Sequence, residues 1–218
     1  SLRQQGEIVS AERVRKSLQR QGLRPVYRRP FVVTTDSNHR LPVAENLLDR
    51  RFDSWQTDQA WVADITYVPT GEGWLYLAAV MDLAGRRIVG WSMSETIDAT
   101  LVCTALKSAW WQRKPSKGVL VHTDRGSQYA SGQYRALDAE MGINMSMSRK
   151  ANAWDNAPME SFFKTLKVER IYQVRYDTRA QARLDIVDWI EGWYNRQRLH
   201  SANGFLPPVI WESTSLAA

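Results

Sequence analysis

Three apolar runs that follow one another between residues 61 and 94 limit the possible folds of this chain more than any other feature of its sequence. They are rich in β-branched and aromatic residues and read WVADITYVP, GWLYLAAVMDLAG and RRIVGWSMS. Only short turns containing Gly or Asp separate them. Because connections this short join antiparallel neighbours, the runs predict a three-stranded meander.

The segments after residue 94 alternate between helix-like and strand-like patterns. The expected strands lie at residues 118–122 and 143–147, and the expected helices at about residues 98–112, 132–141, 157–170 and 178–196. A meander followed by this alternation predicts an α/β fold in which helices flank a mixed five-stranded sheet. The order of elements is that of the ribonuclease H-like fold.

Composition excludes several classes of protein. The chain has 218 residues, of which 44% are hydrophobic, enough for a sizeable core. Its one cysteine, Cys103, excludes an intramolecular disulfide framework. No apolar stretch approaches the roughly 18 residues that a membrane span requires, and no signal-peptide pattern opens the chain. A cytoplasmic, reducing setting without membrane contact is therefore expected.

The positive charge lies at one end of the chain. Residues 1–51 contain 11 Lys or Arg and 5 Asp or Glu, whereas residues 52–218 contain 18 of each, so the first segment carries the whole excess of +6. A basic arm on a neutral globule is the electrostatic footprint of a protein that binds a polyanion, typically nucleic acid. A merely soluble basic surface is the alternative.

The basic arm contains a helix signal. Ser10 is the expected N-cap and Gly22 the expected stop. The candidate DNA contacts on this helix are Arg13, Lys16 and Arg20. These residues fit the last helix of a helix-turn-helix whose earlier helices are missing from this chain, and they fit a solvated basic helix equally.

Three domains follow from these patterns. Residues 1–57 are expected to form the N-terminal arm, which includes a linker over residues 25–57 with a short helix near residues 44–51. The catalytic core is expected over residues 58–176. A helical extension of the core is expected over residues 177–218, and its helix begins with a T-x-x-Q capping box.

Three acidic residues interrupt otherwise apolar elements. Asp64 lies inside the first strand, Asp124 ends the fourth strand, and Glu160 falls in the first turn of the helix that follows WDNAP. We expect the fold to bring these acids together, where two divalent cations would offset their repulsion. Two such ions can stabilise the attacking and leaving oxygens of a phosphoryl displacement.

Each acid also has a purely structural interpretation. Asp64 fits a buried partner of Arg or Tyr, Asp124 an Asx turn, and Glu160 a favourable charge at a helix N-terminus. Lys164 and Lys167 follow Glu160 at helical spacing, so this face is expected to hold a cation at one end and DNA phosphates along the rest. An ordinary Glu–Lys helix pair is the alternative.

Four blocks of sequence together resemble a known family. They read WVADITYVP, HTDRGSQYAS, SRKANAWDNAPMESFFKTLKVE and YNRQRLHSANGFLPP. These blocks resemble the retroviral-integrase-core transposases of bacterial insertion sequences, in particular the second-reading-frame product of the family that uses two overlapping frames. Asp124 and Glu160 are separated by 35 intervening residues, the D,D(35)E spacing of this superfamily. Thr123 and Ala151 are departures, since Ser and Gly are common there.

The resemblance implies that Asp64, Asp124 and Glu160 are catalytic metal ligands for two Mg²⁺ ions, with Mn²⁺ as a substitute. It implies DNA cleavage that frees a 3′-hydroxyl at the element end, followed by attack of that hydroxyl on a target phosphate. No nucleotide triphosphate is required, and the chain has no G-x-x-x-x-G-K-[ST] loop. The alternatives are a metal-dependent nuclease of the same fold and a non-catalytic DNA-binding regulator.

The implied partners are double-stranded DNA, from element ends and target, and further copies of the chain. Transposition joins two DNA ends, so at least a dimer is expected on DNA. The first-reading-frame protein is expected as a fusion partner, and the expected location is the bacterial cytoplasm in association with the nucleoid.

Further DNA contacts are expected around the acids. The loop after Asp124 offers Arg125 and Gln128, the loop before Glu160 offers Arg149, Lys150, Asn152, Trp154 and Asn156, and the last helix ends with Arg196, Arg198 and His200. A structural C-terminal brace explains the last group as well. Tyr129 and Tyr134 are expected to pack the next helix rather than stack on bases. His122 fits either a brace of the metal site or a satisfied strand-end histidine.

Overall fold

The computed structural model describes residue 6 and residues 8–23, 41–150 and 152–216, which divide into two compact units, Ser1–Val33 and Thr34–Ala218. The first unit contains α1 (Ala11–Arg20). The Ser10 hydroxyl accepts a hydrogen bond from the Arg13 N–H at 3.2 Å, which confirms the expected N-cap. The expected linker lies outside the described residues as far as residue 40.

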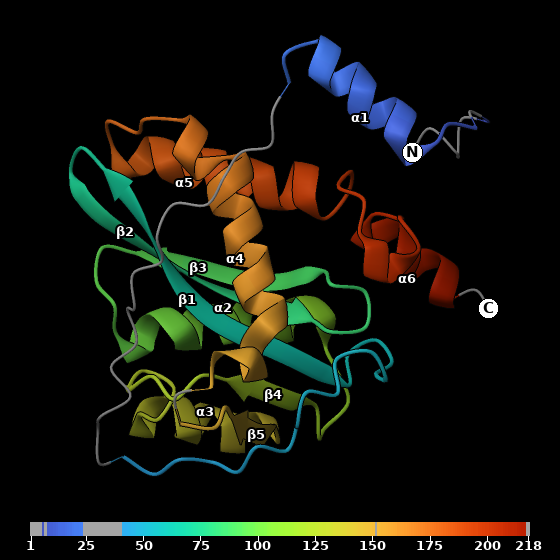
Figure 1. Ribbon diagram of the computed structural model, residues 1–218. Helices are drawn as coiled ribbons and strands as arrows, with labels where there is room; N and C mark the ends of the chain where they lie inside the picture. Colours follow the sequence, from blue (N-terminus) through green and yellow to red (C-terminus); the bar gives the residue numbers. More distant parts are fainter. Residues whose placement is uncertain (1–5, 7, 24–40, 151, 217–218) are drawn as a thin grey trace. The chain divides into compact units, whose positions relative to one another are not determined.

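The second unit is built on a five-stranded sheet in the order β3-β2-β1-β4-β5 (Figure 1). The strands are β1 (Ala60–Thr70), β2 (Gly73–Asp82), β3 (Ile88–Ser94), β4 (Leu120–Thr123) and β5 (Asn144–Met147). The first three are antiparallel, whereas β4 pairs with β1 and with β5 in parallel. This is the mixed sheet that the sequence predicts.

Helices cover both faces of the sheet, as Figure 1 shows. The helices α2 (Ala99–Arg113) and α3 (Gly132–Met141) pack on the face that buries Trp61 and Ala63, and α4 (Ala157–Glu169) and α5 (Arg179–Asp188) pack on the face that buries Val62 and Val68. This division follows from the alternation of side chains along β1. No helix among the described residues has the length and apolar character needed to cross a membrane.

The long helix expected at residues 178–196 has a different second half. Thr178 caps α5 by accepting a hydrogen bond from the Gln181 N–H at 3.1 Å, as the capping box predicts. After Asp188, however, the helix continues as a π-helix over Trp189–Tyr194. A π-turn contains more residues than an α-turn. Trp189 is therefore buried, whereas Trp193, four residues later, is 44% exposed.

The C-terminal segment is fastened to the sheet by side chains. Asn195 accepts a hydrogen bond from the Ile88 N–H and donates one to the Ile88 carbonyl, both at 3.0 Å. Beyond a 3-10 turn at Ser201–Asn203, α6 (Pro208–Leu216) places Glu212 2.6 Å from an Arg87 nitrogen. The segment is therefore part of the same folded unit as the sheet.

The short helix expected near residues 44–51 is absent, and that prediction is wrong. The segment instead lies against the edge strand β5, where the Glu45 carbonyl accepts a hydrogen bond from the Met147 N–H at 3.2 Å. The Leu47 N–H donates to the Ser146 hydroxyl at 2.9 Å. An open strand edge provides unpaired backbone groups, and these contacts outweigh local helix propensity.

Candidate active site

The parallel pairing of β1 with β4 brings Asp64 and Asp124 to the same end of the sheet. In the observed register Val62 lies opposite His122, and each acid follows two residues later in its own chain direction. Asp124 comes directly after the last residue of β4, Thr123. The two acids are thus neighbours because of strand pairing, although 59 residues separate them in the sequence.

Asp64 experiences an unfavourable electrostatic environment. Burial raises the pKa of its carboxyl well above the ordinary value, and the nearby Asp124 carboxylate raises it further, with a smaller effect in the same direction from Glu160. A hydrogen bond from the Ile65 N–H, at 2.8 Å, and the charge of Lys167 act in the opposite direction. Three acids that are distant in sequence therefore interact around Asp64.

Asp124 is held by the loop that follows β4. Its Oδ1 accepts a hydrogen bond from the Gly126 N–H at 2.9 Å, so the Asx turn considered in the sequence analysis is present. A Cβ at residue 126 would lie 3.0 Å from this oxygen and 3.0 Å from Oε1 of Gln128. Glycine at 126 therefore allows the loop to close tightly around the carboxylate.

Glu160 lies in the first turn of α4, which also contains Pro158. The side chain of Asn156, the residue before α4, forms no capping hydrogen bond. The side chain of Asn156 is buried and donates instead to the Ala63 carbonyl at 3.2 Å. This bond fixes the start of α4 beside the residue that precedes Asp64. The side chain of Asn156 faces the sheet in this conformation, and its contact with DNA stays a prediction.

The acids fit a divalent cation by their chemistry. All three supply carboxylate oxygens, the ligands that Mg²⁺ and Ca²⁺ prefer, and the raised pKa of Asp64 reflects negative charge that a cation would neutralise. Within the described part of the chain, however, no three His, Cys, Asp or Glu side chains are arranged to hold one ion. The sheet thus provides an acidic pair, Asp64 within β1 and Asp124 just after β4, and Glu160 extends from the exposed side of the adjacent helix.

Lys167 is half-buried near Asp64 and does not lie on an open basic face of α4. Its ammonium nitrogen is 4.3 Å from the centroid of the Tyr67 ring. Burial lowers its pKa, while the charge of Asp64 acts in the opposite direction. Lys167 therefore serves as a counter-charge for Asp64, and of the two expected phosphate contacts on α4 only Lys164 is exposed.

The sequence analysis missed an ionic cluster in the loop before α4. Asp155 is fully buried, and its two carboxylate oxygens accept hydrogen bonds from Arg149 at 2.8 and 2.9 Å, from Arg50 at 2.8 Å and from Asn46 at 3.0 Å. The hydrogen bonds from Arg149 and, to a smaller extent, from Arg50 hold the pKa of the Asp155 carboxyl far below its usual range, although burial acts in the opposite direction. Arg149, expected to contact DNA, is thus engaged by this carboxylate.

The alternatives for His122 and the two tyrosines are decided by burial. His122 is fully buried, its ring nitrogens lie 2.8 Å from the Ser146 hydroxyl and 3.1 Å from the Ser148 hydroxyl, and burial lowers its pKa to about 4. It is a satisfied strand-end histidine. Tyr129 and Tyr134 are also buried, with perpendicular rings 5.2 Å apart, and they pack the helix as expected.

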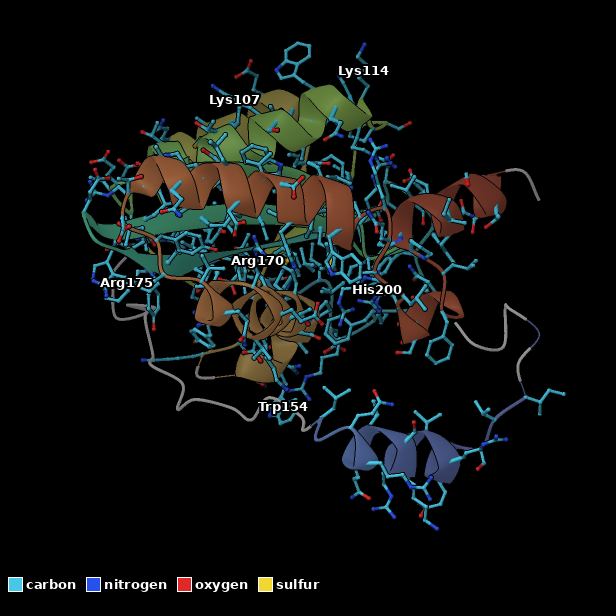
Figure 2. The ribbon with its side chains drawn as sticks, turned by 90° about the horizontal axis from the view of Figure 1, so that it is seen from above. Lys107, Lys114, Trp154, Arg170, Arg175 and His200 are labelled. Carbon is cyan, nitrogen blue, oxygen red and sulfur yellow. The ribbon has the colours of Figure 1, made fainter. Side chains whose placement is uncertain are left out.

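The remaining residues expected to contact DNA near the acids fall into two groups. Lys150 is exposed, and Trp154 is 73% exposed on the outer side of the loop before α4 (Figure 2). Arg125 donates to the Ser148 carbonyl at 2.6 Å, Asn152 accepts from Arg50 at 2.9 Å, and Gln128 is half-buried. The first group is open to a ligand, whereas the second supports the loops.

The C-terminal and N-terminal groups are also placed. Arg196 is exposed, and Arg198 is bound to Glu169 at 2.9 Å. Burial lowers the pKa of His200 to about 4, so this half-buried side chain is neutral near pH 7 and can offer DNA a neutral N–H donor but no positive charge. In the separate N-terminal unit, the side chains of Arg13, Lys16 and Arg20 are exposed on α1.

Comparisons with known proteins agree on one family. Residues 55–153 and 141–208 match the Integrase core domain. The chain is 46% identical over 216 residues to the transposase InsF for insertion sequence IS3A of Escherichia coli (strain K12), covering 99% of this chain and 75% of the relative. It is 44% identical over 208 residues to a 31 kDa protein of insertion element IS600 of Shigella sonnei, covering 95% and 76%.

Solved structures share the fold at low sequence identity. The catalytic core domain of BIV integrase matches 73% of this chain and 97% of its own length, with a TM-score of 0.53 and 17% identity. A simian T-cell lymphotropic virus intasome in complex with PP2A regulatory subunit B56 gamma matches 82% of this chain and 60% of its own, with a TM-score of 0.61 and 14% identity. These similarities identify the integrase-core architecture.

Proposed function

Because the chain belongs to the insertion-sequence transposases with an integrase core domain, we propose that Asp64, Asp124 and Glu160 form its catalytic centre. It is an enzyme of DNA recombination, and its family uses divalent metal ions. The observation that carries the assignment is the environment of Asp64, whose pKa is raised by burial and by Asp124 and Glu160 together. Structural carboxylates are normally paired with cations instead.

In this proposal Asp64, within β1, and Asp124, just after β4, hold Mg²⁺, and Glu160 completes the ligand set by rotation of its side chain. When bound, two ions would supply charge stabilisation for both oxygens of the displacement. The tight turn at Gly126 orients Asp124, and the Asn156 bond to the Ala63 carbonyl orients the start of α4. Lys167 provides the local positive charge that the acids require before a cation binds.

The reaction has two steps, and the number of P–O bonds is unchanged in each. Water attacks the phosphorus at the element end, the P–O3′ bond breaks, and the 3′-oxygen leaves with a proton. That 3′-hydroxyl then attacks a target phosphorus and displaces the target 3′-oxygen. One P–O bond forms and one breaks in each step, so no nucleotide triphosphate is required.

The test incubates labelled element ends with a target plasmid and Mg²⁺ or Mn²⁺. The unaltered chain is expected to yield joined products, whereas Asp124→Asn and Glu160→Gln are expected to yield neither cleaved nor joined DNA. Glu140→Gln, an exposed acid on α3, is the matched control. Cleavage without joining would favour a nuclease of the same fold, and full activity of Asp124→Asn would refute the assignment.

The proposal extends to DNA binding and assembly. The arm over residues 1–57 would bind DNA through Arg13, Lys16 and Arg20. The core over residues 58–176 would act at the scissile phosphates, and the extension over residues 177–218 would stabilise the core. At least two copies would assemble on DNA in the nucleoid, with the first-reading-frame protein as a fusion partner. Removing one exposed phosphate contact should make the slope of the logarithm of the binding constant against the logarithm of salt concentration less steep by roughly one unit.

A further inference from the structure

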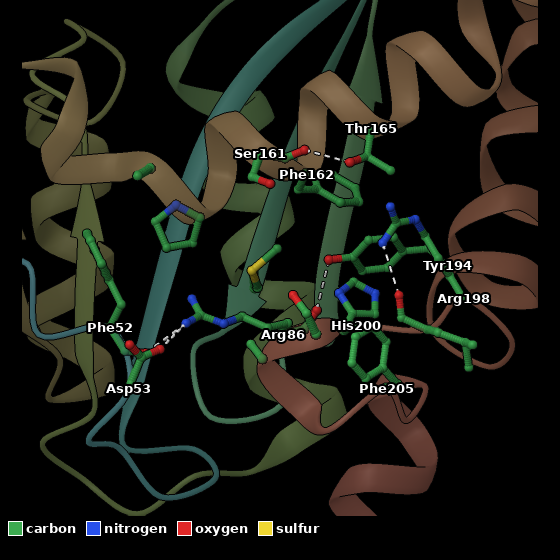
Figure 3. A pocket seen from close by; sticks show the side chains of 16 residues that line it. Phe52, Asp53, Arg86, Ser161, Phe162, Thr165, Tyr194, Arg198, His200 and Phe205 are labelled. Carbon is green, nitrogen blue, oxygen red and sulfur yellow. Dashed lines mark hydrogen bonds and ion pairs between the residues drawn. The ribbon is translucent and has the colours of Figure 1, made fainter. Parts of the chain in front are cut away.

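A cavity of about 540 Å³ lies on the other flank of α4 (Figure 3). Its walls come from α4, from the turn after β2 and from the C-terminal segment between residues 194 and 205. The volume lies within the range of about 300–1,000 Å³ that is typical of small-ligand sites. None of the acids of the candidate catalytic centre lines it.

Aromatic rings form one side of this cavity. Tyr194 makes perpendicular ring contacts with Phe162 and His200, each with centroids 4.8 Å apart. Phe205 lines the cavity and is 56% exposed, and its φ of 63° is a conformation that non-glycine residues rarely adopt. The fold thus holds a large apolar ring at the opening despite backbone strain, which favours a role in binding.

Two arginines also contribute to the walls, Arg86 from the turn after β2 and Arg198 from the segment that carries Tyr194 and His200. Arg86 lies 2.6 Å from Asp53, whose side chain is 85% exposed, and Arg198 lies 2.9 Å from the partly exposed Glu169. The arginine side chains are only 14% and 25% exposed, but their carboxylate partners reach solvent, which weakens these pairs relative to fully buried ones. A phosphate can therefore replace either carboxylate, and a guanidinium binds phosphate in a bidentate geometry.

His200 adds an unsatisfied polar atom. Its Nε2 is buried, and no hydrogen-bond partner for it is found among the described residues. The ring is neutral near pH 7, since burial lowers its pKa to about 4. A neutral imidazole hydrogen-bonds the edge of a nucleobase more readily than a second phosphate.

The cavity lies within reach of a strand bound at the acids. Ser161 and Thr165 of α4 line it, and they directly follow Glu160 and Lys164 in the sequence, so the two surfaces are turned by about 100° around one helix. Resting on the proposed catalytic function, we propose that this cavity binds one unpaired nucleotide of the DNA strand at the active site. Its base would stack on Phe205, and its phosphate would contact Arg86 or Arg198.

The test compares a blunt DNA duplex with the same duplex carrying a single-stranded overhang that contains 2-aminopurine, whose fluorescence falls when it stacks. Omitting divalent cations separates binding from cleavage. The unaltered chain is expected to quench the probe and to bind the overhang roughly tenfold more tightly than the blunt end. Phe205→Ala is expected to lose both effects, whereas Trp111→Ala, an exposed aromatic on α2, is expected to keep them.

A second variant changes affinity in the opposite direction. Glu169→Gln releases Arg198 and should strengthen overhang binding at least twofold relative to the blunt duplex, whereas the exposed-acid control Glu140→Gln should not. Asp124→Asn should keep the overhang preference even when cleavage is lost, so failure of the catalytic proposal remains distinguishable.

Three outcomes would overturn the nucleotide site. The first is that the unaltered chain binds both duplexes equally. The second is that Phe205→Ala quenches the probe as the unaltered chain does. The third is that Phe205→Ala changes the oligomeric state but keeps the overhang preference. The last result would indicate that the cavity holds a second copy of the chain.

Discussion

Asp64 and Asp155 lie close to the start of α4, yet the fold treats them in opposite ways. Neighbouring residues join their two regions, because Asn156 donates a hydrogen bond to the Ala63 carbonyl. Burial and two other acids raise the pKa of Asp64, whereas Arg149 and Arg50 lower that of Asp155. The ionised form of Asp64 is thus unfavourable until a cation binds, whereas the charge of Asp155 is already neutralised by two arginines.

Under the proposed function, this difference separates a metal-binding carboxylate from a structural one. Asp155 connects the loop before α4 to the segment near Arg50, and it contributes to stability as an ion. Asp64 contributes nothing comparable in the absence of metal, since its ionised form is disfavoured by its surroundings. Burial also raises the pKa of Asp82 and Asp138, so what distinguishes Asp64 is the added effect of two further acids, Asp124 and Glu160.

The largest expected contrast is in activity. With Mg²⁺ present, Asp64→Asn should reduce strand transfer at least about a thousandfold, because several kcal/mol of transition-state stabilisation depend on the bound ions. Asp155→Asn should retain a measurable fraction of activity at a temperature where it is folded. Quantifying joined products from both variants tests this, and equal losses would remove the distinction between the two acids.

The second contrast is in stability. Asp155→Asn should lower the free energy of unfolding by about 3 kcal/mol, the lower end of the range for a broken buried ion pair, because both arginines are half exposed. Urea unfolding monitored by circular dichroism measures the change. Asp188→Asn, an exposed acid, is the control. A loss below about 1 kcal/mol would show that the cluster is no stronger than a surface pair.

The pH dependence separates Asp155 from its neighbour His122. The folded-state pKa of His122 is about 4, below the ordinary 6.5, so the unfolded chain binds the proton more readily and stability falls as pH decreases through this window. Between pH 7 and pH 5 His122 alone should account for about 2 kcal/mol. The pKa of Asp155 is lowered, so its contribution is retained above about pH 4 and declines only below that.

Unfolding curves at pH 5, 6 and 7 check the histidine contribution. His122→Asn should flatten the slope over this range, while Asp155→Asn should leave it unchanged and alter only the region below pH 4. A slope that is the same in His122→Asn as in the unaltered chain would assign the titration elsewhere, with His200 as the alternative group.

The smallest expected effect has the opposite sign. In EDTA, Asp64→Asn should raise the free energy of unfolding by about 1 kcal/mol, because the raised pKa means that the ionised carboxyl opposes folding near neutral pH. Added Mg²⁺ should then stabilise the unaltered chain and not the variant. Thermal unfolding with and without the ion measures both. Destabilisation by Asp64→Asn in EDTA would mean that this carboxylate is structural.

The sequence allowed the sheet to be predicted, because period and turn length are local properties. The meander and the cap at Thr178 both follow from residues close together in the chain. Predictions based on residue type alone were less reliable. Three residues with the chemistry of DNA contacts illustrate this. Arg149 is in an ion pair with Asp155, and Asn156 donates a hydrogen bond to a backbone carbonyl. His200 is kept neutral by burial.

The sequence by itself determined the element order, the acids within the first strand and after the fourth, and the spacing between Asp124 and Glu160, since these are patterns along one chain. Only the tertiary structure decided which polar side chains are available. The Asp155 cluster joins residues about 100 positions apart, and the cavity on α4 unites three distant segments. Burial and charge compensation depend on such long-range neighbours, which no local pattern specifies.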